Sequence, residues 1–160
     1  MKYMHVFFIG MALLMSCSNN DEQAEENSPV VGNWTSETIV FQQALDLNQD
    51  DIENNDYKLE LPCFNHSILL NADGTGIYTL NLAARAPQPS PSAFWCTMET
   101  ALDIVWTSSN DVITINDTAS NLSFQIDIIN NNTLERNFTY DRSVLLLNGT
   151  DEVEVTFKKT

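Results

Sequence analysis

From Val30 onward, apolar and polar side chains alternate with a period of two, the spacing of a β-strand that buries one face. The alternating segments are rich in β-branched and aromatic residues, which suit strands, and short stretches rich in Asn, Asp, Ser and Gly separate them. A helical turn is expected only near Ala44. The predicted strands are 34–41, 67–71, 76–82, 102–106, 112–115, 122–128, 134–140, 144–147 and 153–157.

Strands that follow one another through short turns pair as antiparallel neighbours, and a long meander removes its exposed edges by closing on itself. The pattern therefore predicts an all-β fold, an up-and-down antiparallel β-barrel of about eight strands. Residues 30–160 are enough for one domain with one core. Two long loops are expected, an insertion at 44–62 and the proline-rich stretch 83–92.

Residues 1–16 have the pattern of a secretory signal, with the cation Lys2 ahead of the apolar run 6–15. The run is shorter than the roughly 20 residues that a membrane-spanning helix needs. It ends at Leu14-Met15-Ser16-Cys17, which resembles the bacterial lipobox. That resemblance implies lipidation of Cys17 and removal of 1–16. The alternative is an ordinary cleaved signal in which Cys17 occurs by chance.

Residues 17–29 contain no large apolar side chain and are predicted to form a disordered acidic tether. The tether is either a plain spacer or a signal for export to the cell surface. The second interpretation arises because the acids just after Cys17 resemble an export signal used by one group of Gram-negative bacteria. The residue after Cys17 is not Asp, which favours the outer over the inner membrane. We expect a protein anchored to the outer membrane by lipid, with display on the cell surface left open.

The chain has three cysteines, an odd number that needs explanation in an exported protein. If Cys17 carries lipid, Cys63 and Cys96 remain and can pair in an oxidising compartment. A zinc site is the alternative, but His66 is the one histidine beyond the signal and CxxC spacing is missing. A disulfide between Cys63 and Cys96 is therefore the favoured prediction.

With 7 Lys and Arg against 22 Asp and Glu, the chain has a net charge of −15. Such a charge repels phosphate backbones and argues against nucleic acid as a partner. The expected partners are the membrane, reached through the lipid on Cys17, and a small hydrophobic ligand. We expect a monomer.

The segment Gly32-Asn33-Trp34 at the start of the first strand resembles the opening signature of the lipocalins. The order of motifs along the chain is similar to that in lipocalin-like domains of bacterial lipoproteins. The motifs are, in order, the lipobox, the acidic tether, Gly-x-Trp, Cys63 before the hairpin at 69–78, Cys96 and the strand around Trp106. The resemblance covers most of 30–160. It implies an eight-stranded barrel whose closed end is plugged by Trp34.

The residues expected to face the barrel interior alternate in phase along four strands. Ordinary core packing is the default meaning of this stripe, and a ligand cavity is the alternative. The predicted interior residues are Leu102, Ile104, Trp106, Leu122, Phe124, Ile126, Ile128, Leu134, Phe138, Tyr140, Val153, Val155 and Phe157.

Arg136 is the irregular residue of this interior face, because it shares the face of Leu134 and Phe138. A buried guanidinium needs an anion or an aromatic face beside it. The favoured partner is the ring of Trp34, on which Arg136 would stack as an arginine does in lipocalins. A ligand carboxylate is the alternative.

The sequence is poorly equipped for catalysis, and we expect no enzyme. His66, the histidine on which a nucleophile would depend, is predicted at a surface or strand edge. No phosphate-binding glycine loop, HExxH or nucleophile elbow occurs. Most acids alternate with apolar residues and are therefore expected to face solvent.

Asp46, Asn48 and Asp50 match positions one, three and five of a calcium-binding loop. Position six is Asp51 where the loop requires glycine, and position twelve is Tyr57 where it requires an acid. A solvated acidic loop is the favoured interpretation and calcium the alternative, so no cofactor is expected.

These patterns together predict a lipid-anchored, lipocalin-like barrel that binds a small apolar or amphipathic molecule without catalysis. The alternatives are an interaction module with a filled core that binds a protein or glycan and, third, a hydrolase. The candidate ligand-binding residues are Trp34, Trp106, Phe124, Arg136, Phe138 and Tyr140.

Overall fold

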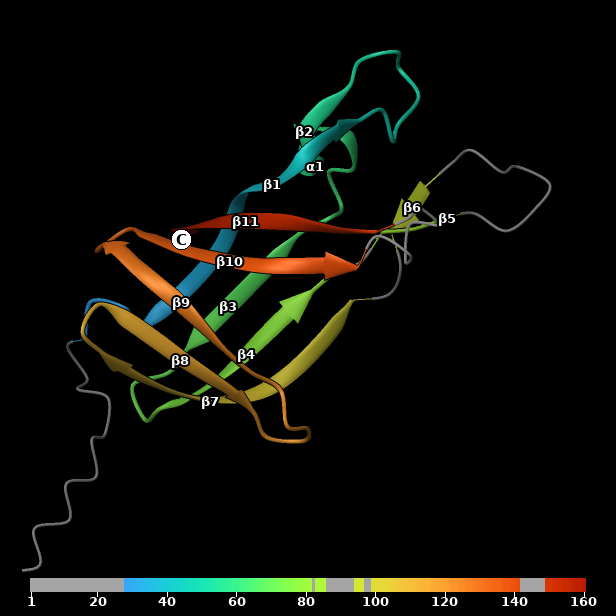
Figure 1. The fold of residues 1–160 in the computed structure, drawn as a ribbon. Helices are drawn as coiled ribbons and strands as arrows, with labels where there is room; N and C mark the ends of the chain where they lie inside the picture. Colours follow the sequence, from blue (N-terminus) through green and yellow to red (C-terminus); the bar gives the residue numbers. More distant parts are fainter. Residues whose placement is uncertain (1–27, 82, 86–93, 97–98, 142–148) are drawn as a thin grey trace, which may run out of the picture.

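The computed structural model describes residues 28–81, 83–85, 94–96, 99–141 and 149–160, without the side chains of 83–85 and 94–96 (Figure 1). The predictions for the signal 1–16, for Cys17 with almost all of the tether, and for a strand at 144–147 lie outside these residues. The elements are β1 Gly32–Leu45, β2 Asn54–Asp56, α1 Tyr57–Glu60, β3 His66–Leu70, β4 Thr75–Leu80, β5 Ala83–Arg85, β6 Phe94–Cys96, β7 Thr100–Ser109, β8 Val112–Asp117, β9 Ser123–Asn130, β10 Thr133–Asp141 and β11 Thr150–Lys159.

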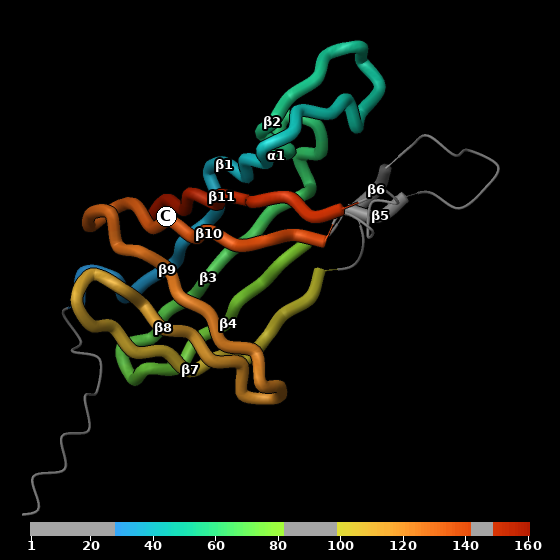
Figure 2. Tube along the Cα trace, viewed as in Figure 1, coloured from blue at the N-terminus to red at the C-terminus, as the bar shows by residue number. Residues whose placement is uncertain are grey.

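Nine strands form one antiparallel sheet in the order β11-β10-β9-β8-β7-β4-β3-β1-β2, and β11 also pairs with β1. This last pairing closes eight of the strands into the up-and-down barrel that the alternation predicted, while β2 extends from β1 (Figure 2). The loop prediction was wrong for 83–85, because β5 pairs with β6 in a separate two-stranded sheet.

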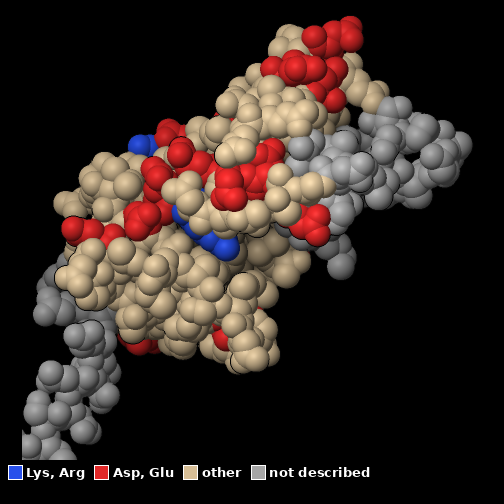
Figure 3. Space-filling view, in the orientation of Figure 1, with Lys and Arg blue, Asp and Glu red and all other residues tan. Residues whose placement is uncertain are grey.

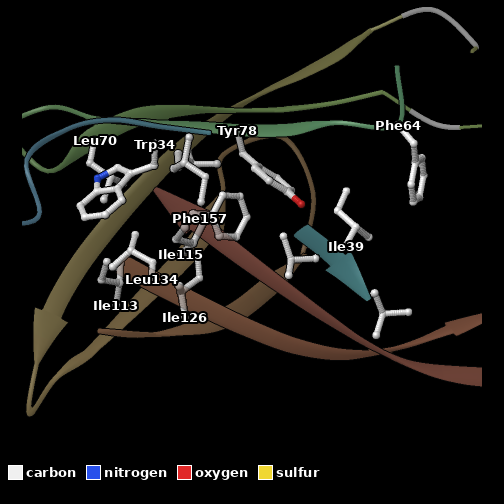
Figure 4. Close-up of a cluster of buried hydrophobic side chains, with 14 of the residues drawn as sticks. Trp34, Ile39, Phe64, Leu70, Tyr78, Ile113, Ile115, Ile126, Leu134 and Phe157 are labelled. Carbon is white, nitrogen blue, oxygen red and sulfur yellow. The ribbon is translucent and has the colours of Figure 1, made fainter. Parts of the chain in front are cut away.

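One end of the barrel interior is packed with apolar side chains around Trp34, which is fully buried (Figure 4). The Trp34 indole donates a hydrogen bond to the Val30 carbonyl at 2.8 Å. Most of the predicted interior residues are buried, but Leu122 remains 44% exposed. The completely buried side chains here include Leu70, Ile113, Ile115, Leu134, Val155 and Phe157.

Gly32 begins β1 with a φ of +136°, a conformation that favours glycine. A Cβ on Gly32 would also lie 3.0 Å from Cε of Lys159. The Lys159 ammonium donates to the Pro29 carbonyl at 2.6 Å and lies 5.5 Å from the centre of the Trp34 ring. The Gly-x-Trp segment therefore lets the end of β11 cross close to β1.

At the opposite end, β1 runs past the barrel and is joined by β2 and α1 (Figure 1). Asp56 is the N-cap of α1, and its carboxylate accepts hydrogen bonds from the backbone of Lys58 and Ile39. The Tyr57 ring stacks on Phe41 with ring centres 3.7 Å apart. The helical turn expected near Ala44 was placed wrongly, because Ala44 lies in β1 and the turn is α1.

The barrel wall opens between β9 and β10. These strands pair at Thr133↔Asn130, Leu134↔Ile128 and Glu135↔Asp127, and no pairing follows between 123–126 and 136–141 in the described structure. Figure 1 shows the two strands separating beyond this point. Figure 3 shows a small patch of Lys and Arg atoms near the middle of this face, with acidic residues above it. Arg136 is the basic residue of these two strands.

Candidate functional site

A pocket of about 150 Å³ lies inside the barrel, between the packing around Trp34 and the aromatic residues next to α1. Its walls come from the segment ahead of β3, from β3, β4 and β10, and from the residue just before β9. The lining is mostly apolar with a few polar groups, as in typical small-molecule sites. The lining residues are Phe64, His66, Tyr78, Leu80, Leu122, Arg136, Phe138 and Tyr140.

Three polar side chains of this pocket form a connected chain. The Arg136 Nη1 donates to the Tyr78 hydroxyl at 3.0 Å, and that hydroxyl lies 2.9 Å from Nδ1 of His66. In Figure 4 the Tyr78 hydroxyl points away from Trp34 and toward the end of the barrel where Phe64 lies. Burial raises the pKa of Tyr78, so its phenol is neutral.

Arg136 lies among aromatic rings, but Trp34 is not one of them. Its guanidinium carbon is 3.8 Å from the centre of the Phe124 ring and 4.6 Å from that of Phe138. The predicted stack of Arg136 on Trp34 was therefore wrong, and Lys159 covers Trp34 instead. Burial lowers the pKa of Arg136 from its ordinary value, although an arginine remains charged at neutral pH.

His66 is buried, with 4% of its surface exposed, so the prediction of a surface or edge position was wrong. It begins β3 and alternates inward with Ile68 and Leu70. Burial lowers the pKa of His66 to about 4, with smaller contributions from the charges of Arg136 and Lys58. The imidazole is therefore neutral at neutral pH.

Three buried polar atoms that belong to lining residues of this pocket have no hydrogen-bond partner among the described residues. They are Nε2 of His66, Nε of Arg136 and the hydroxyl of Tyr140. Burial, followed by the charge of Asp141, raises the pKa of Tyr140. Buried polar groups normally find partners in a folded protein, so a cluster of three in one pocket requires an explanation.

Comparison with protein-family models, curated proteins and solved structures finds no match for this chain. The pocket therefore has to be interpreted from its own geometry.

The structure brings together four of the six predicted ligand-binding residues. Arg136, Phe138 and Tyr140 line the pocket, and Phe124 stacks on Arg136. Trp34 and Trp106 do not line it, because both indoles belong to the packed core. Trp106 also donates to the carbonyls of Asn71 and Thr75 at 3.1 and 2.9 Å.

The sequence predictions missed four lining residues: Phe64, His66, Tyr78 and Leu80. A signal was present for Tyr78 and Leu80, which alternate with Gly76 along β4. His66 is likewise in phase with Ile68. The sequence prediction put it at a surface or edge position because it lies near Cys63 and at the start of a strand. Phe64 precedes β3 and carries no periodic signal.

The acidic loop at 46–50 is held by its own backbone. Asp46 accepts hydrogen bonds from the amides of Gln49, Asp50 and Asp51, and the side chains of Asn48 and Asp50 bond to each other. Within the described ranges, no group of three or more His, Cys, Asp or Glu could hold a metal ion. Calcium at Asp46, Asn48 and Asp50 stays a prediction without support from this geometry.

The side chain of Cys96 lies outside the described residues, so its pairing with Cys63 stays a prediction. On the backbone, Cys96 pairs with Ala83, and the Asn81 amide donates to the Asn65 carbonyl at 2.9 Å. None of the described helices is long and apolar enough to cross a membrane.

Proposed function

We propose that this protein is a non-catalytic binding protein that holds a small amphipathic molecule in the pocket beside the β9–β10 opening. The observation that carries the proposal is that three residues lining a mostly apolar pocket each hold a buried polar atom without a partner among the described residues. Apolar walls favour a nonpolar body through the hydrophobic effect, and the polar atoms favour a polar head. A cavity of this size accommodates about one benzene ring.

Binding rather than catalysis is supported by the chemistry of the lining. The described lining contains no Ser, Thr or Cys to act as a nucleophile and no carboxylate to act as an acid or base. The Nδ1 of His66 is engaged by the Tyr78 phenol, where a catalytic triad would place a carboxylate.

Phenylacetate and phenylacetamide, two molecules with one ring and a small polar head, test the proposal. We expect at least one of them to bind to the full chain in an NMR titration, with the largest shifts at the pocket residues. Leu80→Trp should abolish this binding, because an indole in place of Leu80 occupies the pocket. Ile77→Trp is the matched control, since Ile77 is 39% exposed on the same strand and is not in the lining.

Two results would contradict the proposal. One is that neither probe binds to the wild-type chain. The other is that Leu80→Trp binds as well as Ile77→Trp, which would place the bound probe elsewhere.

We also propose that the barrel is tethered to the outer membrane by lipid on Cys17, as in the lipocalin-like lipoproteins that the sequence resembles. The lipobox ending at Cys17 and the acidic segment after it support this location. Radiolabelled palmitate should be incorporated into the wild-type chain and not into Cys17→Ala. Equal labelling of the two chains would end the anchor proposal.

A further inference from the structure

The hydrogen-bond directions in the pocket follow from the chemistry of the donors. A guanidinium has no acceptor, so the Tyr78 oxygen accepts from Arg136 and the phenol proton is free for another partner. The group within reach is Nδ1 of His66, which therefore acts as the acceptor. The neutral imidazole then carries its proton on Nε2. The opposite tautomer would leave the buried Tyr78 proton without an acceptor among the described residues.

All three unpartnered atoms of the pocket can therefore donate a hydrogen bond. Nε of Arg136 is a donor only, Nε2 of His66 is a donor in this tautomer, and the Tyr140 hydroxyl can donate. The group that completes them must supply acceptors. An ammonium or another donor-only head would leave the three unsatisfied.

The charge of the pocket points the same way. Arg136 is its cation, while His66 and the two phenols are neutral. No carboxylate of the described residues lies within ion-pair distance of Arg136, although the chain holds 22 Asp and Glu. A partly buried cation without a counter-ion is costly, and one negative charge would balance it.

We infer that the pocket binds a small monocarboxylate whose body is about the size of one aromatic ring, with its carboxylate facing Arg136, His66 and Tyr140. This inference rests on the proposed function and specifies the class of its ligand. The apolar body would lie against Phe64, Leu80 and Phe138, which line the same pocket. Arg136 lies just beyond the point where the pairing of β9 and β10 ends.

The test compares phenylacetate with phenylacetamide, which has the same size but no charge. We expect the wild-type chain to bind phenylacetate about ten- to a hundredfold more tightly, as charged hydrogen bonds would give. Arg136→Met keeps a long side chain against the Phe124 ring but removes the charge and the donors. It should lose this preference, because the affinity for phenylacetate falls to about that for phenylacetamide.

Lys158→Met is the matched control, because it removes one positive charge from an exposed position on the neighbouring strand β11. It should keep the preference for phenylacetate. The wild-type comparison needs no variant, so the inference can fail even if Arg136→Met does not fold.

Equal affinity of the wild type for both probes would overturn the inference and leave the proposed function intact. An unchanged phenylacetate preference in Arg136→Met would overturn it as well. Binding of neither probe would remove the proposed function first, and the inference with it. A shift of the His66 Nε2 proton signal that phenylacetate causes and phenylacetamide does not would support the inferred contact.

Discussion

Replacing Trp34 by alanine is expected to lower the free energy of unfolding by about 3–5 kcal/mol. Trp34 is completely buried, and its truncation would leave a large cavity at the closed end of the barrel. The hydrogen bond to the Val30 carbonyl would also be lost, leaving a buried acceptor unpaired. Urea denaturation followed by far-ultraviolet circular dichroism measures the change.

Two further variants identify the cause of the loss. Trp34→Phe keeps a ring in the site and should be less destabilising than Trp34→Ala. Ile129→Ala, at an apolar position that is 54% exposed on β9, should change the free energy of unfolding by less than about 1 kcal/mol. A loss below 1 kcal/mol in Trp34→Ala would show that this indole does not organise the core.

The second large effect is a loss of stability in acid that originates at His66. Its pKa falls from 6.5 in the unfolded chain to about 4 in the folded protein. Between these values the unfolded state binds a proton that the folded state does not, so stability falls as the pH falls through this window. The contribution of His66 to the free energy of unfolding should decrease by about 3 kcal/mol from pH 7 to below pH 4.

Comparison of the wild type with His66→Gln isolates this contribution, because the many carboxylates titrate in both chains. The difference in free energy of unfolding between the two should change with pH between 6.5 and 4 and be constant above that range. An NMR titration of the imidazole gives the pKa directly, with the variant assigning the signal. A His66 that titrates near 6.5 in the folded protein would contradict the burial on which the pocket description depends.

The barrel itself was predictable because its signal is local. Side chains at 153, 155 and 157 alternate inward whatever their partner strand, so a period of two identifies the interior face before any pairing is known. The ends of the strands were harder to predict from the sequence. β1 continues to Leu45 because β2 pairs with it, and the sequence of 41–45 contains no pattern that indicates this pairing.

The partner of Arg136 could not be predicted, because it depends on the register between strands far apart in sequence. In the closing pair, Trp34 lies opposite Lys159, whereas Arg136 pairs with Val155. Val155 is four residues from Lys159 along β11, or about 13 Å. Arg136 is therefore too far along the barrel to cover Trp34, and the aromatic side chains within its reach are Tyr78, Phe124 and Phe138.

Where β9 leaves β10, the contact between Phe124 and Arg136 connects two strands that no longer share backbone hydrogen bonds. The Arg136 guanidinium therefore joins the two strands where they separate, and it is also the positive charge of the pocket. An anion that draws the guanidinium away from the Phe124 ring would weaken this contact between β9 and β10. The side chain that would meet the inferred carboxylate is therefore the same one that joins β9 to β10 through the Phe124 ring.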